Sequence, residues 1–452
     1  MAESTTTAAG APRLKRALNL WDLVLYGVIV LQPTAPMAVF GVINARGQGH
    51  VATTILIALI AMLFTAIAYG RMARAYPSAG SAFTYVGQEI NPALGYITGW
   101  SMVMDYMLNP LICIIWCSEA SRRFAPGVPY WAWAVFYFLM FTGLNLRGVK
   151  TSARINAALA TAMGLVVAIF FVTAARFVFG HPHDGISFFT RPLYDPSTFN
   201  FGAVLGGTSI AVLTYIGFDG ISTLSEEVEN PRRNILLATV LTCVVVGLLS
   251  AAECYTAQLV WPFREPFRDN DTAFIDVAGR AAGSWFFGVM NMTLIVANFG
   301  SGMAAQLGAA RLLYGMGRSN ALPKGFFGAV DPKRHVPRNN VIFVGVIALI
   351  GAFIISYGLG AEMLNFGALI AFMGVNAASF VRYYLRADEK KLVNLIPPVL
   401  GFFVCLLLWL NLSRPAQIAG AIWMIVGIAF GVWKTRGFRG ALIDFELPPE
   451  EA

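Results

Sequence analysis

The sequence predicts an all-α integral membrane protein with twelve transmembrane helices, and three observations carry this prediction. Of the 452 residues, 57% are hydrophobic and only 12% are charged, whereas soluble domains are about 25% charged. Apolar runs of about 20 residues recur along the chain, and each is long enough to cross a hydrocarbon core of about 30 Å. Two of these runs, the first and the sixth, contain residues that interrupt a helix.

Twelve apolar runs define the expected spans. They cover residues 19–44, 51–73, 94–118, 130–147, 155–179, 202–224, 234–261, 284–313, 340–358, 362–385, 393–413 and 416–434. The first ten form two halves of five, 19–179 and 202–385, and residues 393–434 hold the last two. Residues 1–18 and 435–452 are polar and are expected to be tails.

The basic residues indicate the orientation. With the N-terminus in the cytoplasm, the cytoplasmic loops and ends hold most of the 32 Lys and Arg residues, as the positive-inside rule requires. An even number of spans then places both termini in the cytoplasm. The net charge of +8 reflects this topology and no nucleic-acid partner, because the basic residues are scattered over short loops and form no single face.

The first span contains "VLQPTAPMAVFG", in which Pro33 and Pro36 stand beside the polar Gln32 and Thr34. A proline inside a helix removes one backbone hydrogen bond and clashes with the preceding turn. In hydrocarbon, each freed polar group costs several kcal/mol unless it is satisfied. A single proline is compatible with a simple kink, but two prolines and two polar neighbours favour a true interruption.

The sixth span ends in "YIGFDGISTL", where Gly217 and Gly220 surround Asp219. A carboxylate at membrane depth is a functional candidate by default. Interrupted helices at corresponding positions of two halves indicate a transporter built from inverted repeats. The sequence therefore predicts a five-plus-five repeat in which broken helices one and six present free backbone groups to one central site.

Three longer stretches carry a resemblance to a known family. They are "YPSAGSAFTYV" (Tyr76–Val86), "GFDGISTLSEEVENPRRNI" (Gly217–Ile235) and "ARLLYGMGRSNALPKGFF" (Ala310–Phe327). Together they resemble the amino acid–polyamine–organocation permeases over roughly residues 13–440. Within that family, "GWSMVMDY" (Gly99–Tyr106) and "LNFGALIAF" (Leu364–Phe372) are similar to stretches of bacterial putrescine importers.

The resemblance implies the fold shared by these permeases and a multi-pass protein of the bacterial inner membrane. It also implies a secondary transporter that moves a small amine-bearing metabolite, an amino acid or a polyamine, by alternating access. Spans 1, 2, 6 and 7 would rock against spans 3, 4, 8 and 9. The expected substrate-binding residues are Gln32, Pro33, Thr34, Ala35, Pro36, Ala38, Tyr106, Tyr215, Gly217, Phe218 and Asp219.

One position departs from the putrescine importers that the chain resembles. By that resemblance, they carry an aspartate shortly after the Gln-Pro pair of the first span, and Ala38 stands at this position here. A dicationic substrate would therefore lose one carboxylate partner. Tyr215 and Phe218 could stack on an amine, with plain packing as the alternative for both.

Several residues are candidates for coupling and gating. Protonation of Asp105 or Asp219 would allow coupling to H⁺, because burial disfavours an ionised carboxyl group. Backbone carbonyls of the first span with Ser301 could instead hold Na⁺. Glu226 and Glu227 are expected to form a cytoplasmic ion-pair network, for which Arg74 is one candidate partner. Glu253, in the seventh span, is interpreted as a paired polar residue near a helix end.

Other classes of protein fit the sequence less well. Within the transporter class, the alternative is a dedicated putrescine importer. A channel would need a continuous polar pore, and a sensor would usually carry a cytoplasmic signalling domain, which no predicted loop is long enough to hold. No metal site, no cofactor and no enzymatic activity are expected, since the sequence has no Cys/His cluster and no phosphate-binding loop.

Overall fold

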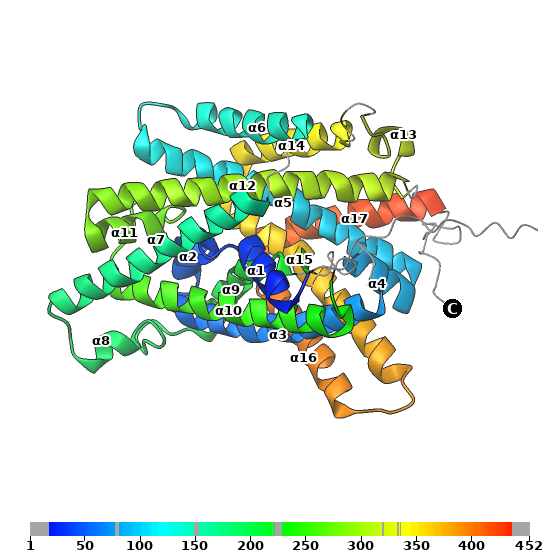
Figure 1. The fold of residues 1–452 in the computed structure, drawn as a ribbon, viewed down its shortest axis with the longest axis horizontal. Helices are drawn as coiled ribbons and strands as arrows, with labels where there is room; N and C mark the ends of the chain where they lie inside the picture. The colour runs from blue at the N-terminus through cyan, green and yellow to red at the C-terminus, as the bar shows by residue number, and fades with distance from the viewer. Residues whose placement is uncertain are drawn as a thin grey trace, which may run out of the picture.

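The computed structural model describes residues 18–76, 81–148, 153–218, 220–221, 228–318, 321–331, 334 and 336–435, and these are almost entirely helical (Figure 1). The helices are α1 (Leu20–Leu31), α2 (Ala35–Arg46), α3 (Val51–Ala75), α4 (Ser81–Glu89), α5 (Pro92–Phe124), α6 (Tyr130–Arg147), α7 (Ala153–Gly180), α8 (Ile186–Thr190), α9 (Phe201–Ala211), η1 (Val212–Tyr215), α10 (Pro231–Val260), α11 (Ala273–Ala282), α12 (Ser284–Arg318), α13 (Lys324–Phe327), α14 (Arg338–Ile354), α15 (Tyr357–Phe380), the π-helix η3 (Val381–Leu385), α16 (Leu392–Leu410) and α17 (Arg414–Thr435). The two expected tails lie almost wholly outside the described residues.

The long helices run roughly along one axis, so the molecule has two ends (Figure 1). The α4 end holds α4, α13 and the last residues of α3 and η3, where Arg382 donates a hydrogen bond to Tyr76. The α8 end holds α8, α11 and the last turns of α2 and α10, where Gln258 donates to Asn44.

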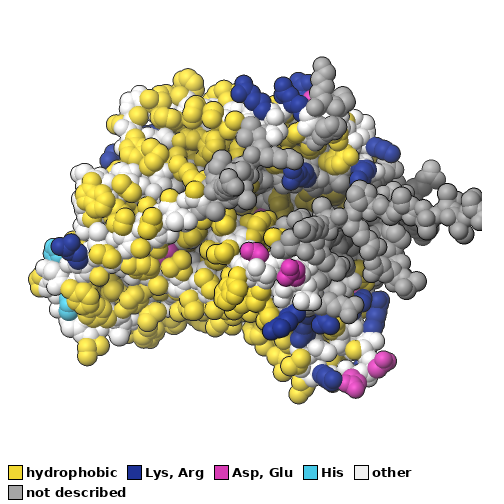
Figure 2. Space-filling view, in the orientation of Figure 1, with side chains coloured by type: hydrophobic (Ala, Val, Ile, Leu, Met, Phe, Trp, Pro, Cys, Tyr) yellow, Lys and Arg dark blue, Asp and Glu magenta, His cyan; other side chains and the backbone are white. Residues whose placement is uncertain are grey.

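Eight of the described helices are each long and apolar enough to cross a membrane. They are α3, α5, α7, α10, α12, α15 with η3, α16 and α17, and the bent pair α1 and α2 adds a ninth crossing when it is counted as one span. Apolar side chains cover much of the described surface (Figure 2), and many large ones are exposed. The nearly all-helical membrane architecture is therefore confirmed.

The observed bounds refine the expected spans. The fourth run, 130–147, coincides with α6, and most others differ from the observed helices by a few residues. The expected ninth run, 340–358, is wrong at its end, because α14 stops at Ile354 and the Ser356 side chain caps the next helix by accepting from the Leu359 N–H. The helices α4, α8, α11 and α13 are short and fall outside the twelve runs.

The first span is broken, as the two prolines predict. Helix α1 begins with a capping box, in which the Asn19 and Asp22 side chains each bond the other's backbone N–H. It ends at Leu31, and α2 starts at Ala35 with its axis turned by 48°. Gln32, between them, has φ +63°, a conformation that non-glycine residues adopt rarely.

The sixth span is also irregular. Helix α9 ends at Ala211, and one turn of 3₁₀ helix, η1, carries the chain to Tyr215. Gly217 has φ +118°, a backbone conformation that glycine adopts without steric cost. The expected helix across 202–224 is therefore interrupted after Tyr215, and the next long helix, α10, begins at Pro231.

Close packing of α5 against α15 depends on Gly367. A Cβ atom at this position would lie 2.4 Å from the Ser101 carbonyl oxygen. Gly367→Ala is therefore expected to destabilise the protein by about 1–3 kcal/mol, the usual cost of overpacking. The measurement is the thermal unfolding midpoint of the detergent-purified variant. The control is Gly164→Ala in α7, which meets no atom within 4 Å and should keep or raise the midpoint; equal midpoints for both variants would contradict this packing.

Candidate functional site

The end of α1 leaves three backbone carbonyls without a partner. Pro33 has no N–H to donate to Ile29, and among the described residues no hydrogen bond reaches the carbonyls of Ile29, Val30 or Leu31. These groups form the C-terminal end of a helix, which carries a partial negative charge. Leu31 is buried, whereas Ile29 and Val30 are partly exposed. Free carbonyls inside a membrane protein favour a cation or another hydrogen-bond donor.

Gln32 holds this break against α12. Its side-chain amide donates a hydrogen bond to the Ala297 carbonyl over 3.0 Å. Ser301 lies one turn farther along α12, so it shares a face with Ala297, and it is hydrogen-bonded to Cys113 of α5. The predicted residues Gln32 and Ser301 are therefore on neighbouring positions of the same interface.

The second break lies against the first. A Cβ atom on Gly217 would lie 3.1 Å from Val30 Cγ1 and 4.0 Å from the Val30 carbonyl oxygen. Among the described residues, no hydrogen bond reaches the carbonyls of Thr214, Tyr215 or Ile216, which end η1. The end of α1 and the break after η1 therefore lie close together.

Two hydroxyl groups complete this set of polar atoms. The side chains of Thr34 and Thr214 are each 1% exposed, and neither Oγ1 has a hydrogen-bond partner among the described residues. Buried polar groups are nearly always paired in native structures. Unpaired hydroxyls at both breaks, beside free carbonyls, mark these residues as candidate ligand contacts.

The start of α2 offers few donors. The Ala35 N–H donates to the Gln32 carbonyl, the Met37 N–H donates to the Thr34 carbonyl, and Pro36 has no N–H. A nest of free backbone amides is what binds a carboxylate at a helix start. The Thr34 N–H has no hydrogen-bond acceptor among the described residues, so at the first break the unpaired acceptors outnumber the unpaired donors.

Three of the predicted contact residues make well-defined packing interactions. The Ala38 carbonyl accepts a hydrogen bond from the Trp116 indole over 3.1 Å. The Tyr215 hydroxyl donates to the Ile55 carbonyl of α3 over 2.9 Å. The Phe218 ring packs edge-on against the Tyr69 ring, with 5.3 Å between centroids. Their side chains or backbone thus help hold α2, η1 and the second break in place.

Asp105 and Tyr106 lie farther along α5 than the residue that contacts α2. Asp105 precedes Trp116 by eleven residues and Tyr106 precedes it by ten, which is about 15–16 Å along a helix. The Asp105 backbone packs against Gly367 of α15, and the Tyr106 ring packs against Gly308 of α12. The structure therefore places both residues toward the α4 end and not beside Ala38.

Other predicted residues lie outside the described part of the chain or at its surface. Asp219, Glu226 and Glu227 lie outside the described residues. Arg74 is exposed at the end of α3. The roles expected for these four residues remain predictions.

An ion-pair cluster at the α4 end was not expected from the sequence. Glu89, which is 1% exposed, accepts hydrogen bonds from Tyr76, Arg382 and Arg386. Burial and the bond to Glu89 raise the pKa of Tyr76 to about 12, so this hydroxyl stays a donor. Tyr76 belongs to the stretch Tyr76–Val86 that carries the family resemblance. Glu89 and the two arginines, however, are almost 300 residues apart, so sequence spacing could not predict their contact.

A backbone contact joins the two segments that precede α1 and α10. Leu18, just before α1, forms an isolated parallel bridge with Val228, just before α10. The Glu229 N–H donates to the Leu18 carbonyl over 2.9 Å. The segments that lead into α1 and α10 are therefore fastened together.

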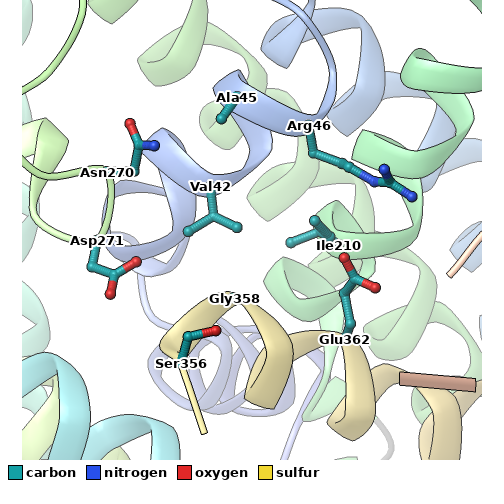
Figure 3. Close-up of a pocket in the computed structure, with 9 residues that line it drawn as sticks. All are labelled: Val42, Ala45, Arg46, Ile210, Asn270, Asp271, Ser356, Gly358 and Glu362. Carbon is teal, nitrogen blue, oxygen red and sulfur yellow. The ribbon is translucent and has the colours of Figure 1, made fainter. Parts of the chain in front are cut away.

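The α8 end contains a cavity of about 390 Å³ (Figure 3). It is lined by Val42, Ala45 and Arg46 of α2, Ile210 of α9, Asn270 and Asp271 of the loop before α11, and Ser356, Gly358 and Glu362 at the start of α15. Ile210 precedes Tyr215 by five residues, about 8 Å along a helix. The cavity thus lies just beyond the two breaks, on the α8 side.

Both signs of charge line this cavity. The Arg46 guanidinium lies over Gly206, where a Cβ atom would come within 2.8 Å of its Nε atom. Glu362 is 7% exposed and accepts from the Ser413 N–H over 2.6 Å. Burial, and then the carboxylates of Asp269 and Glu119, raise the pKa of Asp271 from 3.8 to about 7.

Glu253 of α10 corrects the interpretation made from the sequence. It is fully buried, and neither carboxyl oxygen has a hydrogen-bond partner among the described residues. The expectation that Glu253 is a paired polar residue is therefore wrong. A buried acid without a partner is rare, and nothing in the local sequence distinguishes it from a paired one.

Comparison with known proteins gives a consistent result. A family model described as "Amino acid permease" matches residues 23–433. The low-affinity putrescine importer PlaP of Escherichia coli is 33% identical over 452 residues, which cover 99% of each chain. The branched-chain amino acid permease BcaP of Bacillus subtilis is 24% identical over 93% of each chain. The methylthioribose transporter of the same organism is 24% identical over 94% of each chain.

The raised pKa of Asp271 makes the stability of the protein depend on pH. Between about pH 4 and 7 the folded protein keeps a proton on Asp271 that the unfolded chain loses. The contribution of Asp271 to the free energy of unfolding is therefore full below pH 3.8 and is lost as the pH rises to about 7. Asp271→Asn cannot ionise. Its thermal midpoint in detergent, relative to the wild-type protein, should rise by about 2 °C or more between pH 5 and pH 8.5.

Asn270→Ala, a change of a non-titrating residue in the same cavity, is the control and should show a midpoint difference that does not change with pH. A pH-independent difference for Asp271→Asn as well would contradict the burial of an acidic Asp271.

Proposed function

We propose, because the chain belongs to the amino acid permease family, that it imports a small amine across a bacterial inner membrane by alternating access. The family and the similar proteins are transporters, so the chain is a membrane transporter and not an enzyme. The substrate, the coupling ion and the direction of transport are the proposed parts.

The observation that carries the substrate proposal is the excess of acceptors at the two breaks. An ammonium group donates three hydrogen bonds and accepts none. It therefore matches the carbonyls of Val30 and Tyr215 and the hydroxyls of Thr34 and Thr214, which have no partner among the described residues. The C-terminal ends of both half-helices add a favourable dipole. A carboxylate would find few free N–H groups at the start of α2.

This asymmetry favours an amine or diamine over a zwitterionic amino acid. Ala38 provides no carboxylate, so backbone carbonyls would take the role of one ammonium partner. Asp105 and Asp219 remain the candidates for a second ammonium group. The similarity to a putrescine importer over the full chain supports the narrower proposal that the substrate is a short diamine.

The proposed topology has twelve spans in two inverted halves. Eight helices and the bent pair account for nine crossings. The three others would be α6, the short apolar helix α14, and α9 with η1, in agreement with the twelve predicted runs. The α4 end would face the cytoplasm, since Arg71, Arg382 and Arg386 lie there.

With that orientation, the described conformation would be closed to the cytoplasm. The Glu89 cluster and the Leu18–Val228 bridge fasten the α4 end, while the cavity beside Arg46 and Asp271 lies on the periplasmic side. Substrate would pass from this cavity to the breaks, and rocking of the bundle would then open the α4 end. We propose H⁺ as the coupling ion, with Na⁺ held by carbonyls and Ser301 as the alternative.

Thermal stabilisation of the purified protein tests the substrate class. A ligand that binds only the folded state stabilises it by about 2.7 kcal/mol at 100 times its dissociation constant. Putrescine should raise the midpoint, whereas 1,4-butanediol, which has hydroxyls in place of both ammonium groups, should not. Leucine should shift it less than putrescine.

The matched variant combines Pro33→Ala with Pro36→Ala, which restores the missing N–H groups. Its apparent affinity for putrescine, read from the shift of the thermal midpoint, should fall at least tenfold. A shift with leucine and none with putrescine would contradict ammonium recognition. An unchanged putrescine affinity in the double variant would show that the break is not the binding site.

A further inference from the structure

Glu253 is the most unusual titratable residue that the proposed substrate site does not use. It lies in the interior of α10 with 0% of its surface exposed, and both carboxyl oxygens lack partners among the described residues. An ionised carboxylate in such a place costs several kcal/mol. The side chain is therefore neutral, that is protonated, in this conformation.

Within the described part of the chain, no charged side chain on the surrounding helices is placed to pair with an ionised Glu253. Helix α10 packs against α1, α2, α3, α7, α11 and η1. Their described charged residues are engaged elsewhere or exposed: Asp22 bonds Asn19, Arg46 lies over Gly206, Arg71 bonds Val393, Arg74 and Arg176 are exposed, Asp276 pairs with Arg123, and Arg280 pairs with Glu265.

The remaining titratable neighbours are uncharged. Cys254 adjoins Glu253 on the same helix, and the Tyr215 hydroxyl of η1 donates its proton to the Ile55 carbonyl. Neither group supplies a positive charge. The state of Glu253 is therefore set by its burial and not by an ion pair.

Glu253 stands in a column of unpaired polar groups that passes the first break. Thr242, eleven residues or about three turns earlier, shares its face of α10 and contacts Gly27 of α1. Ser250, one turn earlier, lies between them. The hydroxyls of Thr242 and Ser250 have no partner among the described residues. Gln32 follows Gly27 by five residues, so the break lies at a height between Thr242 and Glu253.

We propose that Glu253 carries the coupling proton, an inference that rests on the proposed proton-coupled function. Its O–H bond is intact in the conformation described here, which has its cavity on the α8 side. When the bundle moves and water from the α4 side reaches α10, the O–H bond breaks, the proton passes to that water and a carboxylate remains. After the substrate leaves, the empty protein returns with the carboxylate, which then takes up a proton from water that enters on the α8 side. One proton therefore crosses per cycle, and the packing described here is restored once the carboxyl group is protonated.

This assignment separates the proton site from the amine site. The carbonyls at the breaks would bind the substrate without participation of Glu253, so exchange of substrate across the membrane should not need its proton. Net uptake driven by a pH gradient should need it. A residue with a purely structural role would affect both processes alike.

Glu253→Gln tests the proposal, since glutamine has nearly the shape of the protonated acid and cannot ionise. Proteoliposomes that enclose a pH-sensitive dye receive external putrescine, lysine or leucine. The wild-type protein should acidify the lumen with at least one of these compounds. Glu253→Gln should acidify at least tenfold more slowly, while its counterflow of the same labelled compound at equal pH stays within about twofold of the wild-type rate.

Thr239→Ala is the matched control on the same helix, because the Thr239 hydroxyl is satisfied by the Ile235 carbonyl. It should acidify the lumen at the wild-type rate. A second readout needs no substrate: the thermal midpoint of the wild-type protein should fall relative to that of Glu253→Gln as the pH rises from 5 to 8.5.

The outcomes distinguish the inference from the function on which it rests. Acidification by Glu253→Gln at the wild-type rate, or an equal pH dependence of the two midpoints, would overturn the role of Glu253 alone. Counterflow without acidification by the wild-type protein would overturn proton coupling itself, and the role of Glu253 with it.

Discussion

The structure depends on one constraint, that backbone groups inside a membrane must be paired by the protein or used by a ligand. Pro33 has no N–H to pair with the Ile29 carbonyl, and among the described residues no hydrogen bond reaches the carbonyls of Ile29, Val30 or Leu31. The Gln32 amide fastens this end to the Ala297 carbonyl of α12. Gly217 brings the chain after η1 against Val30, so that the two breaks lie close together.

The two ends of the molecule differ in their packing on either side of the breaks. At the α4 end, the buried Glu89 joins Tyr76 to Arg382 and Arg386, and Val228 is bridged to Leu18. At the α8 end, a cavity bounded by Asp271 lies a short distance beyond the breaks. A fastened end, the two breaks and a cavity, in that order along one axis, are consistent with the alternating access proposed for this protein.

Sequence reasoning predicted the membrane architecture and the first break, because both follow from local properties: apolar length and the chemistry of proline. It also placed an interruption near Gly217, where glycines surround an acid. It did not find the Glu89 cluster, since burial of an acid between α4 and η3 depends on contacts almost 300 residues apart. It misjudged Glu253, because the partner of a buried acid is a property of packing. Asp219, Glu226 and Glu227 lie outside the described residues, and their roles remain predictions.

The central claim, that an amine binds the free backbone groups of the two breaks, is tested most directly by hydrogen–deuterium exchange with and without saturating putrescine. Peptides that span Gln32–Ala35 and Thr214–Gly217 should exchange more slowly with putrescine, because the ligand orders both breaks and excludes water from them. The exposed helix α8 should show no change. Unchanged exchange at both breaks, together with a measurable thermal shift by putrescine, would contradict the claim and place the amine elsewhere in the protein.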